Sequence, residues 1–356
     1  MARFRGRFAA LALSAGGLAL LLNGPMTADA EQAQTGNSRT ADLKPSAMPY
    51  IDAHIHIYEH DPDASLQLTM QAMEHLNGTK AFVQTEPYGA GNPASWDIEK
   101  VLASVKKHPD KFILMGGGGT LNPMILEAAR TGDAGPAVQK KFRARAEEIL
   151  REGAVGFGEL STEHFSLPTA PVKDYEYAPA DSPLMLLLAD IAAEHNVPID
   201  LHMEAIPKDM PSGLPAPNLP TLHGNFDALE NLLAHNPRAK IIWAHAGSDN
   251  TGFRTPDLMR PLLQRHPNLY MEIKYDPGAL GKNPPVVDGK LKPEWLKLYQ
   301  DFPDRFVIGS DQHYDPPATA PLARAQGNAT LLSQLPADLR QKIGMENPMR
   351  IYGLGH

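Results

Sequence analysis

The sequence predicts an α/β protein of the (β/α)8 TIM-barrel class, built as a single domain and preceded by a secretory signal peptide. Eight short, largely apolar runs of 4–8 residues alternate with longer amphipathic stretches between residue 49 and the end of the chain. Short apolar runs of this kind are typical of parallel strands that are buried on both faces. Eight such strands, separated by helical crossovers, indicate a barrel.

The first thirty residues have the pattern of an export signal. Three arginines within residues 1–7 precede an apolar run at 8–22, and residues 28–30 read Ala-Asp-Ala. This order of a basic, an apolar and a small-residue region is that of a cleaved secretory signal peptide, 1–30. The apolar run is 15 residues long, which is short for the ~20 that a membrane span needs. We therefore expect export, periplasmic or secreted, without a stable membrane anchor.

Residues 31–48 are polar and lack periodicity, so we expect a flexible lead-in there, and the barrel then occupies 49–356. The expected strands are Tyr50–His56, Lys80–Thr85, Phe112–Met115, Ala154–Glu159, Pro198–His202, Lys240–His245, Leu269–Lys274 and Phe306–Ser310. Helical patterns between them include Trp96–Lys107, Ala137–Arg151, Leu184–His195, Phe226–His235 and Pro256–Arg265.

A doubly wound open sheet is the alternative fold, but it usually has fewer strands and a glycine-rich first turn. The glycine run 116–119 follows the third expected strand instead, and it lacks the lysine of a P-loop. We expect it to allow close backbone packing near the barrel mouth.

Composition excludes several kinds of site. Cysteine is absent, so the chain has no disulfides, thiol nucleophiles or thiolate metal ligands. The formal net charge is −8, and no broad basic surface for nucleic acid is expected. The chain has 33 prolines, about 9% of its residues against a usual ~5%, which predicts long, stiffened loops.

Four of the fourteen histidines stand at the C-terminal ends of expected strands. That end of a barrel carries the active site. His54 and His56 lie two residues apart on the first strand, so both side chains leave it on the same side. His202 ends the fifth strand and His245 ends the sixth. The four imidazoles are therefore expected to meet at the barrel mouth.

Two carboxylates complete this set. Asp311 follows the eighth strand, and Glu159 ends the fourth, where it could bridge two ions. A single buried strand histidine more often has a structural role, but ligand-type residues at five strand ends of one barrel predict a metal site. Imidazoles combined with carboxylates suit Zn²⁺, with Mn²⁺ as a second option, and one or two divalent ions are expected.

The ligand-type strand ends resemble those of the amidohydrolase superfamily of metal-dependent hydrolases. They are His54-x-His56 on strand one, His202 on strand five, His245 on strand six and Asp311 on strand eight. The tail at 343–354 resembles that of the amidohydrolase-related (amidohydrolase 2) subgroup, which also includes aminocarboxymuconate-semialdehyde-type decarboxylases and pyrone-dicarboxylate-type lactonases. The resemblance covers 49–354 and implies a distorted (β/α)8 barrel with one or two divalent ions, without fixing the substrate.

Two positions depart from the family pattern. Many binuclear members carry a carbamylated lysine on strand four, where this chain has Glu159. A glutamate there resembles TatD-type nucleases and acetylglucosamine-phosphate deacetylases. The alternative is that Glu159 does not bind metal and instead supports the ligands from behind or forms a buried salt bridge. After Asp311 the chain reads Gln312-His313-Tyr314 in place of an aromatic-proline turn. His313 is thus either an additional site residue or a loop residue.

These residues predict activation of water. A divalent ion lowers the pKa of its bound water, and Asp311 could take the proton and pass it to a leaving group. His245 either binds a second ion or polarises the substrate carbonyl. The expected reaction is hydrolysis of an amide, lactone, ester or phosphoester of a small organic substrate. The alternatives are a metal-dependent decarboxylase on the same barrel and a non-catalytic ligand-binding barrel.

Substrate contacts are expected from the loops that follow the strands. Lys274 and Tyr275 leave the seventh strand and Arg254 follows the sixth, with a solvent-facing charge as the alternative for either cation. Together with His313 they are the expected substrate-binding residues, suited to a small molecule that carries a carboxylate or phosphate. An acidic chain of this kind does not suit duplex DNA. Homodimers are common for such barrels, but no residue identifies an interface.

Overall fold

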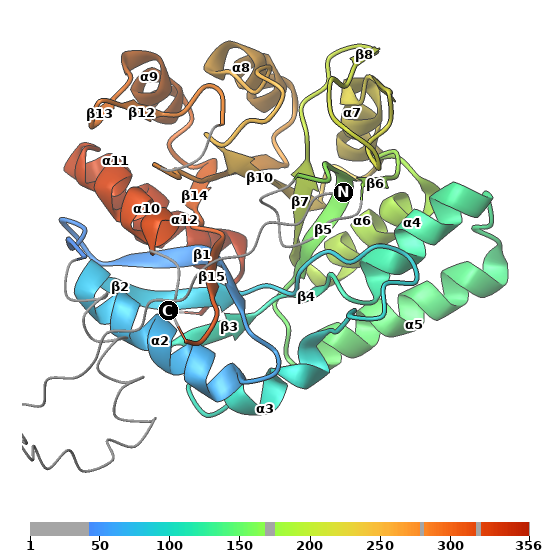
Figure 1. Ribbon diagram of the computed structural model, residues 1–356, viewed down its shortest axis with the longest axis horizontal. Helices are drawn as coiled ribbons and strands as arrows, with labels where there is room; N and C mark the ends of the chain where they lie inside the picture. Colours follow the sequence, from blue (N-terminus) through green and yellow to red (C-terminus); the bar gives the residue numbers. More distant parts are fainter. Residues whose placement is uncertain (1–42, 168–174, 278–280, 318–321, 356) are drawn as a thin grey trace, which may run out of the picture.

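The strands form two parallel sheets that the helices surround (Figure 1). The computed structural model describes residues 43–167, 175–277, 281–317 and 322–355. The strands of the two sheets are β1 (Tyr50–Ile57), β2 (Gly78–Val83), β3 (Phe112–Leu114), β4 (Gly116–Gly117), β5 (Phe157–His164), β7 (Pro198–Met203), β10 (Lys240–Ala246), β11 (Leu269–Ile273), β14 (Phe306–Ile308) and β15 (Gln312–Tyr314). One sheet has the order β15-β1-β2-β3 and the other the order β14-β11-β10-β7-β5-β4.

Two passages of the chain join the sheets into a ring. β3 and β4 are consecutive parts of one passage: Met115 donates a hydrogen bond of 2.9 Å to β2, and Gly116 donates one of 3.2 Å to the residue before β5. β14 and β15 are likewise parts of one passage, in which Gly309 donates to β11 at 3.0 Å and Asp311 donates to β1 at 2.8 Å. Counting each passage once gives eight parallel strands in chain order around the ring, which is consistent with the predicted (β/α)8 barrel.

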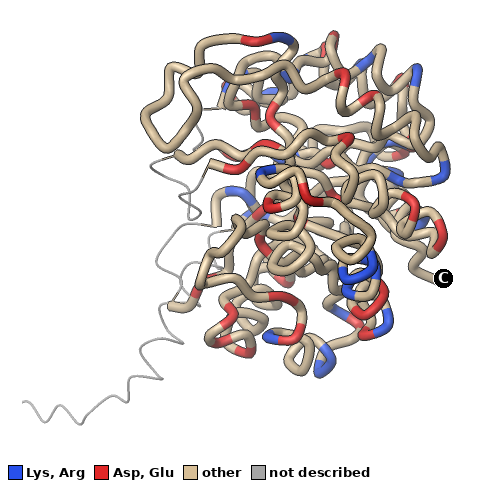
Figure 2. The backbone as a smooth tube through the Cα atoms, turned by 90° about the vertical axis from the view of Figure 1, so that its right-hand side faces the viewer, with Lys and Arg blue, Asp and Glu red and all other residues tan. Residues whose placement is uncertain are grey.

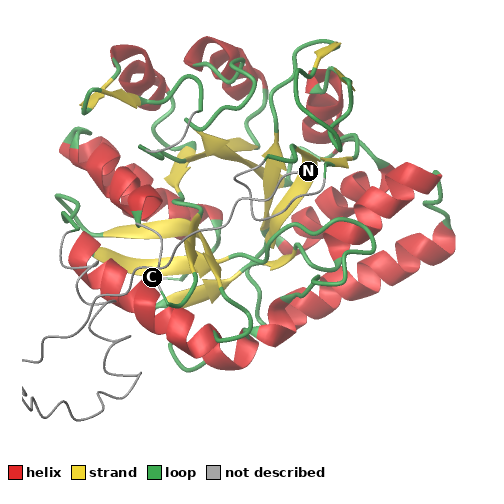
Figure 3. Cartoon of the chain, in the orientation of Figure 1, coloured by secondary structure: helices red, strands yellow, loops and turns green. Residues whose placement is uncertain are grey.

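The helices lie outside the strands (Figure 3). They are α2 (Pro62–Leu76), α3 (Leu102–Val105), α4 (Leu121–Thr131), α5 (Pro136–Glu152), α6 (Pro183–His195), α7 (Phe226–His235), α8 (Pro256–Arg265), α9 (Pro293–Asp301), α10 (Ala323–Ser333), α11 (Ala337–Gln341) and α12 (Asn347–Ile351), with a 3-10 turn η1 (Ile98–Lys100) and a π-helical turn η2 (Lys342–Glu346). Five of these helices begin with proline, whose fixed φ suits the first helical position. Part of the proline excess therefore starts helices rather than stiffening loops.

Short strand pairs lie outside the two main paths. They are β6 (Glu176–Tyr177) beside β5, β8 (Met210–Pro211) with β9 (Thr221–Leu222), and β12 (Val286–Val287) with β13 (Lys290–Leu291).

Four of the five predicted helical stretches correspond to α5, α6, α7 and α8, but the stretch at 96–107 does not form one helix. It contains only η1 and the single turn of α3. The reason lies in Asp97, whose buried carboxylate accepts hydrogen bonds from the backbone N–H of Ile98 (2.9 Å) and of Gly117 (3.0 Å). Because this carboxylate ties the start of the stretch to the β3–β4 passage, tertiary contacts override the helical pattern.

The interior of the ring is apolar at one end. One buried cluster contains Phe82, Ile242 and Val307. The residues next to them on the same strands belong to other clusters, which they form with the helices. Because successive side chains alternate across a strand, these three point into the ring. Tyr352, close to the end of the chain, packs against them, with its ring centroid 4.1 Å from that of Phe82. Apolar side chains thus fill this end and leave the polar site to the other.

The predicted signal peptide, 1–30, lies outside the described residues, as does most of the predicted lead-in, 31–48. In the described part of that lead-in, Lys44 exchanges hydrogen bonds of 2.6 and 3.1 Å with the side chain of Gln326 in α10. Ser46 donates to the last residue of α2 at 2.9 Å. Residues 43–48 are therefore attached to the barrel. In the described ranges we find no helix whose length and apolarity would let it cross a bilayer.

Acidic and basic residues are interspersed along the outer helices and loops (Figure 2). Arg143 of α5 pairs with Glu194 of α6 at 2.7 Å, and Arg265 of α8 pairs with Glu230 of α7 at 2.6 Å. Water and salt screen exposed pairs of this kind, so they add little stability. The packed interior carries most of it.

The glycine run packs closely against backbone, as predicted. A Cβ atom on Gly118 would lie 2.3 Å from the carbonyl oxygen of Glu86, and one on Gly119 would lie 1.6 Å from that of Trp96. Gly118 also donates a 2.9 Å hydrogen bond to the hydroxyl of Thr85. The run therefore holds the loop after β2 against the β3–β4 passage, where part of the site is built.

Replacing Gly119 by alanine should destabilise the fold. The added methyl group overlaps backbone that cannot rotate away, so we expect Gly119→Ala to lower the free energy of unfolding by about 3 kcal/mol or more. Gly355→Ala is the matched control, because no atom lies within 4 Å of its added Cβ, and its change should stay within ~0.5 kcal/mol. Urea unfolding of both variants measures the difference, and equal stabilities would contradict the close packing.

Candidate metal centre

The six predicted ligands come together at the C-terminal ends of the strands. We call them the ligand cluster: His54 and His56 of β1, Glu159 of β5, His202 of β7, His245 of β10, and Asp311 between β14 and β15. In four of them, one ligand atom each lies within 4.8 Å of the others, and all four residues are buried. These four are His54, Glu159, His245 and Asp311.

Glu159 lies at the centre of the cluster. Its Oε1 atom is 2.8 Å from His202 Nδ1 and 2.8 Å from His245 Nε2. Its Oε2 atom is 3.5 Å from His54 Nε2 and 3.4 Å from His56 Nε2. One carboxylate thus faces four imidazoles, two on each oxygen, which is an arrangement suited to bridging.

Asp311 directs its two carboxylate oxygens at different partners. Oδ1 lies 3.1 Å from His56 Nε2 and 4.0 Å from His54 Nε2. Oδ2 accepts hydrogen bonds from the buried ammonium of Lys274 and, at 2.9 Å, from the guanidinium of Arg324 in α10. The carboxylate therefore joins the imidazoles to two cations at the edge of the cluster.

Hydrogen bonds orient the imidazoles of His54 and His56, and an ion-pair contact orients that of His245. His54 Nδ1 is 2.9 Å from Glu272 Oε2, and His245 Nδ1 is 3.3 Å from Oε1 of the same carboxylate. His56 Nδ1 is 3.1 Å from the carbonyl oxygen of Gln84. When Nδ1 donates its hydrogen to these acceptors, Nε2 presents a lone pair to the cluster, as a metal-binding histidine requires.

Two residues of the cluster have backbone conformations that are rare outside glycine. His245 has φ 64° and Asp311 has φ 52°, both left-handed. The pairing of β10 with β11 shifts register between Trp243 and Ala246, next to His245. Such conformations cost roughly 1–3 kcal/mol each, and surrounding contacts must hold them in place. They turn the two side chains away from the regular alternation of a strand and toward the cluster.

Electrostatics couple the members of the cluster. Burial alone would raise the pKa of Glu159, but His54, His202 and His245 hold it well below its usual range. Burial lowers the pKa of His202, but its contacts with Glu159 and Glu204 outweigh this and raise it to about 9. In the metal-free chain, protons on the imidazoles therefore balance the buried carboxylates.

Asp311 and His56 follow the same logic. The charges of Lys274 and Arg324 outweigh burial and hold the pKa of Asp311 well below its usual value. Hydrogen bonds to Asp311 and Glu159 outweigh the burial of His56 and raise its pKa to about 9. Each group is kept charged by a neighbour of opposite sign.

The donor set fits a divalent ion. Four separations among the Nε2 atoms of His54 and His56 and the nearest oxygens of Glu159 and Asp311 are between 3.1 and 3.5 Å. A fifth, from His54 Nε2 to Asp311 Oδ1, is 4.0 Å. Ligand atoms around a tetrahedral ion with bonds of ~2.0–2.1 Å lie about 3.3 Å apart. Imidazole nitrogens with carboxylate oxygens suit Zn²⁺ or Mn²⁺.

The predicted substrate-binding residues divide into two pairs. Lys274 contacts Asp311, and His313 lies with Nε2 3.8 Å from Asp311 Oδ1, so both border the cluster. Arg254 is instead buried over the ring of Trp243, 4.2 Å from its centroid. Tyr275 packs its ring against the main core. The structure thus brings Lys274 and His313 to the cluster and places Arg254 and Tyr275 against other groups.

Several polar groups around the cluster were not identified from the sequence. Glu272 orients two of the imidazoles, and Asp200 is fully buried with its Oδ1 3.8 Å from His54 Nδ1. Glu272 lies two residues before Lys274, and Asp200 lies two residues before His202, each on an apolar strand. Because side chains two apart on a strand share a face, this spacing could have indicated that both carboxylates point into the ring. Arg324 lies in an ordinary helix, where nothing in the local pattern marks it.

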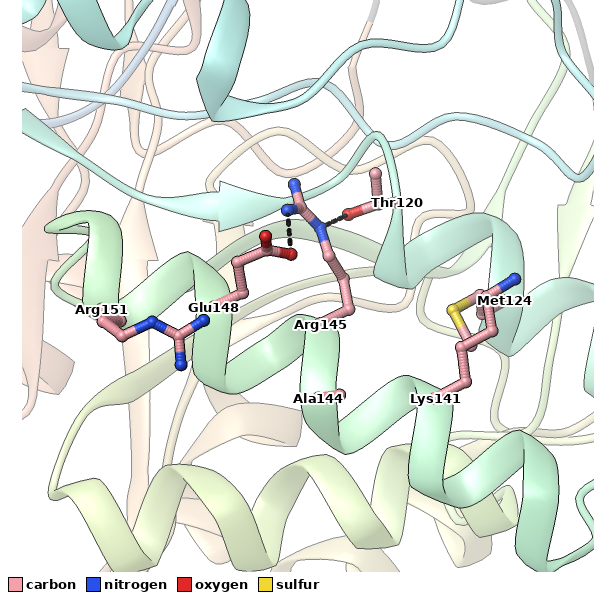
Figure 4. Close-up of a pocket in the computed structure, with 7 residues that line it drawn as sticks. All are labelled: Thr120, Met124, Lys141, Ala144, Arg145, Glu148 and Arg151. Atoms are coloured by element: carbon pink, nitrogen blue, oxygen red, sulfur yellow. Dashed lines mark hydrogen bonds and ion pairs between the residues drawn. The ribbon is translucent and has the colours of Figure 1, made fainter.

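A hollow lies outside the ring, between α4 and α5 (Figure 4). It has a volume of about 580 Å³. Its lining residues are Thr120, Met124, Lys141, Ala144, Arg145, Glu148 and Arg151. Arg145 donates to Thr120 at 3.0 Å and to Glu148 at 2.8 Å, as Figure 4 shows. Because its own neighbours engage this arginine, the pocket is not a comparable candidate site.

Comparison with known proteins places the chain in a family. The family model described as Amidohydrolase matches residues 51–354, which include the whole ligand cluster. No curated protein matches the sequence.

Several solved structures are similar at low identity. A candidate amidohydrolase from Staphylococcus aureus is 13% identical, with 86% of this chain and 100% of that chain covered and a TM-score of 0.47. A candidate 2-pyrone-4,6-dicarboxylic acid hydrolase from Acinetobacter baumannii, with citric acid bound, is 14% identical, with 86% and 99% covered and a TM-score of 0.49. A dihydroxybenzoic acid decarboxylase from Polaromonas, with bound manganese and 2-nitroresorcinol, is 13% identical, with 88% and 98% covered and a TM-score of 0.43.

These distant structural similarities do not assign a family or a function. The family model, in contrast, matches nearly all of the described barrel. The chain belongs to the amidohydrolase family and is an enzyme of the metal-dependent amidohydrolase type.

Proposed function

We propose that this enzyme hydrolyses an amide, lactone, ester or phosphoester bond in a small organic substrate that carries a carboxylate. The observation that supports this most directly is the convergence of imidazole Nε2 atoms and carboxylate oxygens on one point. The Nδ1 atoms of these imidazoles, on the side away from that point, contact Glu272 or a backbone carbonyl oxygen. Such a constellation is suited to holding an ion that activates water.

The residues that would hold a divalent ion, Zn²⁺ or Mn²⁺, are His54, His56, Glu159, His245 and Asp311, with His202 adjoining through Glu159. When bound, such an ion supplies a Lewis acid that acidifies water and polarises the bond to be cleaved.

Asp311 is the proposed proton carrier. Its Oδ1 faces the imidazoles, where the attacking water must lie, so it can accept the proton of that water and deliver it to the leaving group. With Lys274 and Arg324 on Oδ2, the carboxylate is a weak base. A substrate that draws these cations away makes Asp311 a stronger base.

The same two cations support a carboxylate-bearing substrate. Lys274 and Arg324 both contact one oxygen of Asp311, and Arg324 also pairs with Asp276 at 3.2 Å. Ammonium and guanidinium groups form charge-assisted hydrogen bonds with carboxylates. A substrate carboxylate bound at this edge would place a neighbouring bond over the cluster.

We further propose that the enzyme is exported, because residues 1–30 have the order of a cleaved signal peptide. Expression of the full chain in a Gram-negative host should yield a periplasmic protein whose N-terminal sequence begins near residue 31. A cytosolic protein that retains Met1 would contradict export.

Isotope analysis of the products tests the reaction. With a cleaved carboxylate substrate in H₂¹⁸O, we expect ¹⁸O in the product and no CO₂ release, whereas CO₂ release without ¹⁸O would indicate a decarboxylase.

Asp311→Asn should retain at least one ion and lose about 10³-fold in kcat. Asp315→Asn, an exposed aspartate directly after β15, is the control and should keep full activity. A fully active Asp311→Asn enzyme would refute the proposed proton carrier.

Metal binding should depend on pH. The pKa values of His56 and His202 are raised to about 9 in the metal-free chain, so both imidazoles hold protons at pH 7. A divalent ion displaces these protons, and affinity therefore falls as pH falls. Calorimetry of Mn²⁺ binding in two buffers of different ionisation enthalpy should detect roughly one to two protons released per ion. A metal affinity that stays constant from pH 6 to pH 8 would contradict this prediction.

A further inference from the structure

We propose that Glu204 binds the end of the substrate that lies opposite its carboxylate. The substrate then has an ammonium or hydroxyl group on one side of the scissile amide or ester bond and a carboxylate on the other. The proposal rests on the proposed function, in which Lys274 and Arg324 hold that carboxylate. It narrows the substrate from any small carboxylate to one with a hydrogen-bond donor at its far end.

Glu204 borders the ligand cluster. It follows β7, two residues after His202, so the two side chains leave the strand on the same side. Glu204 Oε1 is 3.7 Å from His202 Nε2, and His202 Nδ1 is 2.8 Å from Glu159. One imidazole ring therefore separates Glu204 from the centre of the cluster. Its side chain is 7% exposed, close to the 9% of Lys274.

The carboxylate of Glu204 and the two cations flank the cluster on different sides. Glu204 follows β7 and Lys274 follows β11, and β10, which carries His245, lies between these strands in the sheet. Lys274 and Arg324 contact the cluster through Asp311, whereas Glu204 contacts it through His202. A substrate that spans the cluster therefore meets positive charge at one end and negative charge at the other.

Three loops hold the backbone around Glu204 in place. The side chain of Asn225, after the β7 loop, donates to the carbonyl oxygen of Glu204 at 2.7 Å. The N–H of Glu204 donates to the carbonyl oxygen of Glu163 in β5 at 3.3 Å. Thr251, in the loop after β10, donates to the carbonyl oxygen of Ala205 at 2.7 Å. A binding group that is fixed in advance loses little entropy when a ligand arrives.

One oxygen of Glu204 is available to a ligand. Oε1 accepts a 2.6 Å hydrogen bond from the exposed residue Asn250. In the part of the chain that the structure describes, Oε2 has no hydrogen-bond partner, and it is not closed off from solvent. The 3.7 Å contact with His202 is longer than a hydrogen bond, whereas Glu272 lies 2.9 Å from His54. Glu204 is therefore not fully engaged in orienting an imidazole.

A carboxylate at this place selects by charge. It accepts a charge-assisted hydrogen bond from an ammonium group and a hydrogen bond from a hydroxyl group. A methyl group there would leave the buried carboxylate without a new partner, and a second carboxylate on the substrate would be repelled. We therefore expect amino- and hydroxy-terminated substrates to be preferred over dicarboxylates.

Four N-acylglycines of matched size test this preference. They are glycylglycine, glycolylglycine, N-propionylglycine and N-malonylglycine, which end in an ammonium, a hydroxyl, a methyl and a carboxylate group. Calorimetry on the Mn²⁺-loaded protein measures the affinity for each. Glycylglycine and glycolylglycine should bind about 10–100-fold more tightly than N-propionylglycine, with N-malonylglycine weakest.

Variants separate substrate binding from metal binding. Glu204→Gln should lower the affinity for glycylglycine about 10–100-fold and keep the manganese content of the wild type. Glu272→Gln is the comparison, because it should weaken Mn²⁺ binding about 10–100-fold. Asp209→Asn is the matched control. Asp209 lies on the loop after the same strand, but it is exposed and contacts His223 and Gly224, so the order of the four probes should not change. Thermal unfolding of each variant checks the fold.

The outcomes are distinguishable. Equal affinities for the four probes, tightest binding of N-malonylglycine, or binding of none of them would overturn the role of Glu204 and leave the proposed hydrolase intact. If Glu204→Gln loses manganese as Glu272→Gln does and keeps the order of the probes, Glu204 only orients His202, and the proposal fails. A wild-type protein that binds no Mn²⁺ would instead contradict the proposed function.

Discussion

The structure of the site depends on one buried carboxylate, that of Glu159, which faces four imidazoles inside a ring of strands. A carboxylate in a dry interior is costly unless charges of opposite sign compensate it. Protonated histidines provide that charge in the metal-free chain, and a divalent ion can take their place. Glu272 contacts His54 and His245 through their other ring nitrogens, so a layer of imidazoles lies between two buried carboxylates. Removing any layer leaves a buried charge without its partner.

The barrel makes this layering possible because alternation along each strand separates two environments. Side chains that face outward pack against helices, and those that face inward are apolar at one end and polar at the other. Phe82, Ile242 and Tyr352 fill the apolar end, which excludes water from beneath Asp200 and Glu272. The low dielectric there strengthens every interaction of the layers above. The tail of the chain, which carries Tyr352, therefore contributes to the electrostatics of a site that it does not touch.

Most of the site could be predicted because its ligands follow a rule that the sequence shows directly. A histidine or carboxylate at the end of a short apolar run lies at the barrel mouth, and spacing by two residues puts His54 and His56 on one face. Residues that act from a distance escaped this rule. Arg324 reaches Asp311 from a helix that the local pattern does not distinguish, and Arg254 lies buried over Trp243 because tertiary packing decides where a loop cation points. The left-handed backbone at Asp311 also has no sequence marker, since such conformations are commonly marked by glycine.

In the proposed mechanism, Asp311 connects metal binding with substrate binding through its two oxygens. Oδ1 faces the imidazoles, and Oδ2 is held by Lys274 and Arg324. While both cations remain on Oδ2, they hold the pKa of the carboxylate well below its usual range, which suits a ligand better than a base. A substrate anion that engages the cations weakens this hold at the moment when a proton must be accepted. On this proposal, the basicity of Asp311 rises only when substrate is bound, which would couple the activation of water to the presence of the bond to be cleaved. This coupling needs no movement of the barrel, because the groups involved already lie within contact distance of one another.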